Sequence, residues 1–251
     1  MNIQYGSNRL RSSLYLLFVV LLALAGNVYT ANADDDGGLG DPDRRDRLIP
    51  LVQADDALQP MQKELALEAL GLVGRKNLNI DGKWFTYDCS GTVMAAMYLS
   101  GLNVLNPFKN ADGTGVERLW QMGREANVLY DLPLPQVGDL IFWDNTWDAD
   151  HNKKWDDQLT HVGLVVWVWP DGTVEYVHED YARGITIARM NLFVPATQWA
   201  VADNGTRVEL NSPLRMRSQE YLNPGVTLSS QLFRGFGRLW ELPTQRLSTL
   251  R

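Results

Sequence analysis

Cysteine is the scarcest side chain in this sequence: its 251 residues include one cysteine, and only three histidines. A single cysteine excludes an internal disulfide. If the protein is exported, this thiol must therefore persist as a free group in an oxidising compartment, which favours a chemical use for it over simple packing.

Long hydrophobic runs are also lacking, apart from residues 14–25. That run is about a dozen residues, short of the ~20 that a membrane-spanning helix needs. Arg9 and Arg11 precede it, and an Ala-Asn-Ala sequence that ends at Ala33 follows it. This order predicts a signal peptide, residues 1–33, cleaved after Ala33. We expect a protein exported to the periplasm or the cell exterior without a stable membrane anchor; an uncleaved anchor is the alternative.

Positive charge is in short supply as well. Without Arg9 and Arg11 the chain keeps 21 basic residues against 30 acidic ones, a formal net charge of −9. This balance excludes binding to a phosphate backbone as the main activity, so we expect no nucleic-acid partner. We expect a monomer.

Apolar spacing predicts helices in the first half of the chain. Residues 34–50 are rich in charge, glycine and proline and are expected to form a disordered leader. The expected helices cover about residues 56–73, 92–100 and 114–126, and the first of them is expected to have Asp55 or Asp56 as its cap.

Strands are expected in the second half. They cover residues 138–143, 160–169, 173–178 and 184–190. Helices followed by strands predict an α+β fold with N-terminal helices packed on an antiparallel sheet, within a core of residues 51–200. Residues 201–251, with possible strands at 206–210 and 232–239, are expected to pack on this domain or to complete it.

The lone cysteine, Cys89, lies where a short aromatic segment meets a helical run of small and apolar residues. Asp88 or Ser90 can cap this helix. Unpaired backbone N–H groups and the positive end of the helix dipole there favour a thiolate, so Cys89 is a candidate nucleophile. The alternative from position alone is a small buried hydrophobe.

A cysteine nucleophile needs a base and a third group that orients the base. His161 begins one expected strand and His178 ends the next, whereas His151 lies in a polar loop and is expected to be solvated. If Pro170-Asp171 closes the hairpin, the two strand histidines lie on one face as diagonal neighbours whose rings can meet. A bulge would reverse this parity.

These segments together resemble a known family. Residues 87–91 are Tyr-Asp-Cys-Ser-Gly, residues 138–143 are Gly-Asp-Leu-Ile-Phe-Trp and residues 160–165 are Thr-His-Val-Gly-Leu-Val. In this order they resemble the signature of the NlpC/P60-type cell-wall cysteine peptidases, which have a papain-like core. The likeness spans about residues 65–192. Relatives also carry a Gly-x-Pro-Tyr-x-x-Gly-Gly stretch that is absent from residues 71–83 here.

The resemblance implies a role for each matched residue. Cys89 is the nucleophile, His161 the base and His178 the orienting residue, while Glu179 or Asp180 are alternatives to His178. The backbone N–H of Cys89 would contribute to the oxyanion hole. Tyr87, Asp88 and Ser90 are expected to bind substrate.

The implied substrate is the peptide stem of bacterial peptidoglycan, cleaved most often at the γ-D-glutamyl–diamino acid bond, with no cofactor required for catalysis. One alternative is an amidase of the CHAP type, which cuts between muramic acid and L-alanine. Another is a non-catalytic, calcium-ordered cell-wall-binding protein with a buried thiol.

A polar loop before His161 has partial calcium-loop spacing. Its ligands would be the side chains of Asp148, Asp150, Asn152 and Asp156 and the carbonyl of Lys154. Lys153 replaces the turn glycine and Leu159 the bidentate acid, so Asp157 would have to substitute. This spacing leaves two interpretations open, a solvated acidic loop and a loop ordered by a structural calcium ion.

Overall fold

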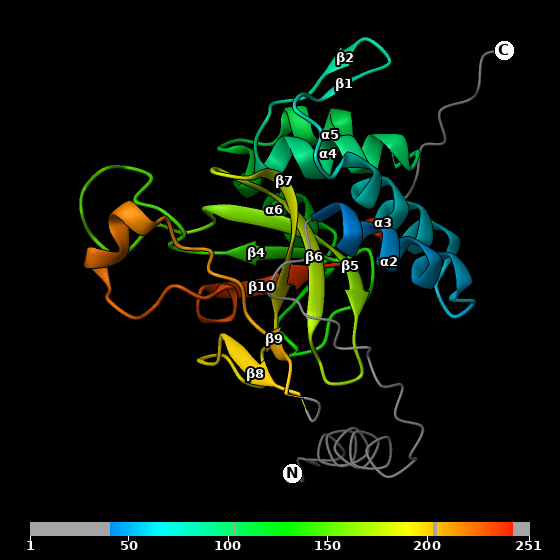
Figure 1. Cartoon of the computed structure of the whole chain (residues 1–251). Coiled ribbons are helices and arrows are strands. Elements are labelled where there is room, and N and C mark those ends of the chain that lie inside the picture. The colour runs from blue at the N-terminus through cyan, green and yellow to red at the C-terminus, as the bar shows by residue number, and fades with distance from the viewer. Residues whose placement is uncertain (1–40, 103, 203–204, 243–251) are drawn as a thin grey trace, which may run out of the picture. The chain divides into compact units, whose positions relative to one another are not determined.

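The computed structural model describes residues 41–102, 104–202 and 205–242, all within one unit, residues 35–251 (Figure 1). The predicted signal peptide, residues 1–33, lies outside the described residues. In the described part of the chain, no helix combines the length and apolar character needed to cross a bilayer.

Helices dominate the first half of this unit and strands the second. The helices are α2 (Asp41–Ala54), α3 (Pro60–Leu72), α4 (Cys89–Leu99), α5 (Leu105–Asn110) and α6 (Gly115–Glu125), with short 3-10 helices η1 (Arg217–Leu222), η2 (Ser229–Gln231) and η3 (Leu239–Glu241). The strands are β1 (Asn79–Ile80), β2 (Lys83–Trp84), β3 (Leu129–Tyr130), β4 (Leu140–Trp143), β5 (His161–Val168), β6 (Val174–Asp180), β7 (Gly184–Met190), β8 (Trp199–Val201), β9 (Arg207–Glu209) and β10 (Phe233–Gly237).

Six strands form the central sheet in the order β3-β10-β4-β5-β6-β7, and every neighbouring pair is antiparallel. Two short hairpins, β1-β2 and β8-β9, stand apart from it. The helices and the antiparallel sheet confirm the predicted α+β class.

Both faces of the sheet are apolar, because successive side chains on each strand alternate between two buried clusters. On β4, Leu140 and Phe142 join the cluster on the helical face, while Ile141 and Trp143 join the other. Helices α2, α3 and α4 pack on strands of the first face. The second face is covered by C-terminal residues, Leu214 among them.

The start of the described chain corrects the prediction of a disordered leader. Residues 41–50 are helical, as part of α2. Leu48 and Val52 are fully buried, and the buried Arg44 donates from Nη1 to the carbonyl of Ile187 at 3.3 Å. The two apolar residues lie four apart on one helix face, so packing on the sheet stabilises a helix that composition alone argues against.

The next helix also begins later than predicted. Gln59 is the N-cap of α3 and Pro60 is its first residue, rather than a helix that starts near Asp55 or Asp56. Proline suits this position, since its missing N–H would have had no helical partner there.

The C-terminal strand β10 lies inside the sheet, between β3 and β4. Phe236 is fully buried, and Arg234 Nη1 lies 2.8 Å from Asp144 Oδ2 just beyond β4. Residues after 200 therefore complete the same domain, one of the two arrangements expected for them.

Candidate active site

Cys89 is the first residue of α4, as predicted, and Asp88 is its N-cap. One oxygen of Asp88, Oδ1, accepts from the backbone N–H of Gly91 at 2.7 Å and from the hydroxyl of Ser90 at 2.8 Å. A side chain at position 91 would overlap the carbonyl oxygen of Thr86, so a glycine is required there. These contacts fix the cysteine at the helix start.

The two strand histidines meet through the pairing of β5 and β6. Leu164 lies opposite Val177, but beyond a bulge Trp167 lies opposite Glu175, one residue out of step. The turn is thus wider than a Pro170-Asp171 closure, and the bulge restores the parity that such a closure would give. The prediction that the two rings meet is confirmed.

His161 Nε2 lies 2.9 Å from His178 Nδ1, and the rings are edge-to-face with centroids 5.1 Å apart. Trp143 lies beside His161, with ring centroids 5.7 Å apart, and Tyr176 beside His178, at 5.2 Å. Trp143 is itself held by a hydrogen bond from Nε1 to the carbonyl of Ser229 at 2.8 Å. This packing orients the histidine pair and leaves Nδ1 of His161 for another partner.

Cys89, His161 and His178 line one pocket of about 1340 Å³. Hydrogen bonds among the described residues do not join Cys89 to His161, so their relation rests on the shared pocket. The other walls include the start of α6, residues 146, 147, 149 and 156–160 of the loop before β5, residues 179–183 and residues 212–218.

The thiol is neutral at rest, which corrects the expectation of a thiolate. Burial first, and then the charge of Asp88, raise the pKa of Cys89 to about 12, against the backbone N–H groups of Val162 and Ser90, which lower it. Glu179 adds to the rise. Burial and two carboxylates therefore outweigh the helix terminus.

Both histidines are neutral at pH 7. Burial lowers the pKa of His161 to about 4, although the charges of Asp180 and Asp88 oppose the change. Burial, and then the neighbouring His161, lower the pKa of His178 well below its usual value. A neutral imidazole keeps one nitrogen lone pair, so His161 can accept a proton.

The acidic residues after His178 also line the pocket. Asp180 Oδ2 lies 3.1 Å from Arg183 Nη2. Burial raises the pKa of Asp180, but its bonds to Arg183 outweigh this and lower it overall. Burial, helped by Asp180 and Asp88, raises the pKa of Glu179. His178, rather than either acid, contacts His161.

The three expected substrate-binding residues have different surroundings. Asp88 and Ser90 line the pocket, although Ser90 is buried and its hydroxyl is bonded to Asp88. Tyr87 is absent from the pocket lining, and its hydroxyl donates to the carbonyl of Arg75 at 2.7 Å. The structure therefore does not bring Tyr87 to the thiol.

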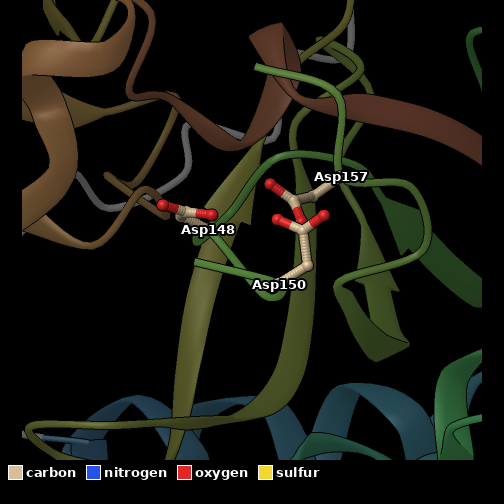
Figure 2. A group of neighbouring side chains, drawn as sticks. All are labelled: Asp148, Asp150 and Asp157. Atoms are coloured by element: carbon tan, nitrogen blue, oxygen red, sulfur yellow. The ribbon is translucent and has the colours of Figure 1, made fainter. Parts of the chain in front are cut away.

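The predicted calcium loop forms a different cluster from the one expected. Asp148, Asp150 and Asp157 each bring one carboxylate oxygen within 4.8 Å of the others (Figure 2). Asp156 is exposed and outside this group, and its Oδ1 accepts from Asn152 Nδ2 at 3.2 Å.

The remaining polar atoms of the predicted loop bond to each other. Asn152 Nδ2 donates to Asp150 Oδ2 at 2.8 Å, and the N–H of Lys154 donates to Asn152 Oδ1 at 2.7 Å. The loop folds back so that Asp157, the expected substitute for the bidentate acid, lies with Asp148 and Asp150, whereas Asp156 lies outside this group.

Comparisons with protein-family models, curated proteins and solved structures found no match for this chain.

Sequence reasoning missed part of the pocket wall. Arg215 is buried, its guanidinium lies over the Trp155 ring at 4.3 Å from the centroid, and Nη1 donates to the carbonyl of Asn145. Nothing in the local sequence around Arg215 signals this role, because its partners lie about 60 to 70 residues earlier in the chain.

Proposed function

We propose that this chain is an exported cysteine hydrolase with a papain-like core, acting on amide bonds of peptidoglycan stem peptides in the periplasm or outside the cell. The observation that carries the proposal is the His161–His178 contact of 2.9 Å in the pocket that Cys89 lines. A nucleophile, a base and a group that orients the base are the three components such chemistry needs.

The pKa values of Cys89 and His161 in the free protein decide how the nucleophile forms. With a neutral thiol and a neutral imidazole, attack and proton transfer occur together: Nδ1 of His161 takes the thiol proton as sulfur attacks the carbonyl carbon. Nε2–H of His161 donates to Nδ1 of His178, which holds the base in the required tautomer. The backbone N–H groups of Val162 and Ser90 support the sulfur as it loses its proton.

The reaction then proceeds through a thioester intermediate. The tetrahedral oxyanion is bound by the backbone N–H of Cys89, the C–N bond breaks, and His161 gives its proton to the leaving amine. Water next attacks the thioester, His161 takes a proton from that water, and the thiol leaves with a proton. The products are a carboxylic acid and a free amine.

The substrate class rests on the family resemblance, and the size of the pocket supports it. A volume of about 1340 Å³ exceeds the 300–1,000 Å³ range usual for small ligands and suits a branched peptide. We propose the γ-D-glutamyl–diamino acid bond as the site of cleavage. The CHAP-type amidase reaction is distinguished by its products.

The test is mass spectrometry of peptidoglycan fragments after digestion with the mature protein. Cys89→Ala and His161→Ala should abolish the products, whereas His151→Ala should not, because His151 is exposed and outside the pocket lining. Fragment masses name the bond. Equal activity of wild type and Cys89→Ala would refute the cysteine mechanism.

A second function is favoured by one observation, the rise in the pKa of Cys89 to about 12. A half-buried thiol that stays neutral suits a cell-wall-binding protein without catalysis. Pull-down on insoluble peptidoglycan, with no fragments released and no alkylation of the native thiol, would support this binding role.

A further inference from the structure

The loop between β4 and β5 brings three carboxylates together, and two of them are almost fully buried. Asp148 is 4% exposed and Asp157 is 8% exposed, whereas Asp150 is exposed. Figure 2 shows Asp150 and Asp157 facing each other, with one oxygen of Asp148 directed toward them. Like charges placed so closely repel unless something positive lies between them.

In both buried carboxylates one oxygen is bonded and the other is not. Asp148 Oδ2 accepts from the N–H of Lys153 at 3.0 Å, and Asp157 Oδ1 accepts from the N–H of Ala149 at 3.0 Å. Asp148 Oδ1 and Asp157 Oδ2 are buried and have no hydrogen-bond partner among the described residues. A buried carboxylate oxygen without a partner is costly, so both atoms point to a missing ligand.

Arg215 interacts electrostatically with Asp148 and Asp157, but its hydrogen bonds go to other groups. Arg215 donates from Nη1 to the carbonyl of Asn145 and from Nη2 to the carbonyl of Gln219 at 3.4 Å, and it lies over the Trp155 ring. Its charge is felt at Asp148 and Asp157, but one cation does not balance three carboxylates.

We propose that Asp148, Asp150 and Asp157 bind a calcium ion. Calcium takes oxygen ligands at 2.3–2.6 Å, so two ligands on opposite sides of the ion lie about 5 Å apart, which fits oxygens within 4.8 Å of one another. Magnesium demands a tighter octahedron, with opposite ligands about 4 Å apart. The remaining positions are filled by water or by loop carbonyls.

This proposal does not depend on the proposed hydrolysis. The ion would hold together residues 146–160, a loop that contributes to one wall of the pocket and ends next to His161. Its role is structural, since the cluster contributes no group to the histidine pair.

Terbium is the direct probe, because Trp147 immediately precedes Asp148 and can sensitise terbium emission. The full mature chain is titrated with terbium in phosphate-free buffer, and the bound terbium is then displaced with calcium. Wild type should give saturable emission that calcium reverses. Asp148→Asn and Asp157→Asn should weaken binding by about tenfold or more, because the charge and number of ligands set calcium affinity.

The matched control is Asp156→Asn, an exposed acid in the same loop that lies outside the cluster. It should change terbium affinity by less than about twofold. An equal loss in Asp156→Asn and Asp157→Asn, or no saturable emission from wild type, would overturn the proposal.

Thermal unfolding guards against variants that simply misfold. In chelator, Asp157→Asn should melt at or above the wild-type temperature, because one repelling charge is gone. In calcium the order should reverse, since tighter ligand binding stabilises the wild type more than the variant. Loss of stability in Asp157→Asn under both conditions, with no calcium effect on wild type, would assign these carboxylates to packing alone.

Discussion

Acid is expected to destabilise this domain through two histidines of the pocket, the half-buried His161 and the buried His178. The folded pKa of His161 is about 4, below the value of about 6.5 that the unfolded chain has. Between these values the unfolded chain binds more protons, so stability is complete above pH 6.5 and is lost as the pH falls toward 4. For His161 this amounts to about 2 kcal/mol between pH 7 and pH 5.

His178 adds a loss of the same sign, because its pKa is lowered as well. The sum is a substantial part of the 5–15 kcal/mol that holds a typical domain folded. Urea unfolding at pH 7, 6, 5.5 and 5, at constant ionic strength, gives the free energy of unfolding at each pH.

Variants distinguish the contribution of these histidines to the pH dependence of stability from that of carboxylates that titrate in the same pH range. His161→Gln should reduce the pH slope by about 1 kcal/mol per pH unit, whatever its constant effect on stability. His151→Gln is the matched control for the loss of a histidine, since His151 is exposed and outside the pocket lining. An unchanged slope in His161→Gln would refute the account of His161 as a neutral base.

Three other outcomes follow from the site. The rate of alkylation of Cys89 by iodoacetamide should be low at neutral pH and rise about tenfold per pH unit up to pH 10, because the pKa is about 12. Asp88→Asn should raise this rate, since it removes a charge that raises the pKa. A rate that levels off near pH 6 would contradict both expectations. Gly91→Ala should lower the free energy of unfolding by about 1–3 kcal/mol, because its Cβ would overlap the carbonyl oxygen of Thr86 at the helix start. Gly71→Ala, whose Cβ would have nothing within 4 Å, should be neutral or stabilising by up to about 1 kcal/mol in thermal melts. Equal melting temperatures of the two variants would contradict this. If the hydrolase proposal holds, His178→Gln should keep measurable activity on peptidoglycan, since an amide oxygen can accept from an imidazole N–H, while His178→Leu should lose about a hundredfold or more; equal losses would remove the orienting role.

Local patterns predicted much of the sheet and the histidine pair. Strands β5, β6 and β7 follow from runs of β-branched residues separated by turn signals. The side-chain period of two then puts His161 and His178 on one face once the hairpin parity is right. The bulge that restores this parity has no sequence signal that we recognised.

Features that depend on distant partners escaped prediction. Helix α2 forms because Leu48 and Val52 pack on the sheet, and its charged sequence hides this. The expected thiolate failed mainly because burial raises the pKa of Cys89, and burial depends on residues far along the chain. The charge of Asp88, which caps the helix and adds to this rise, was visible in the sequence next to Cys89.

The place of β10 in the sheet has a kinetic consequence for folding. Strand β4 pairs with β10, and about ninety residues separate the ion-paired Asp144 and Arg234 beside this pairing. Until β10 joins the sheet, one edge of β4 keeps its backbone groups unpaired beside the apolar side chains of Ile141 and Trp143. Such an edge invites pairing with another chain, so the domain is most prone to aggregation before its C-terminal strand is in place.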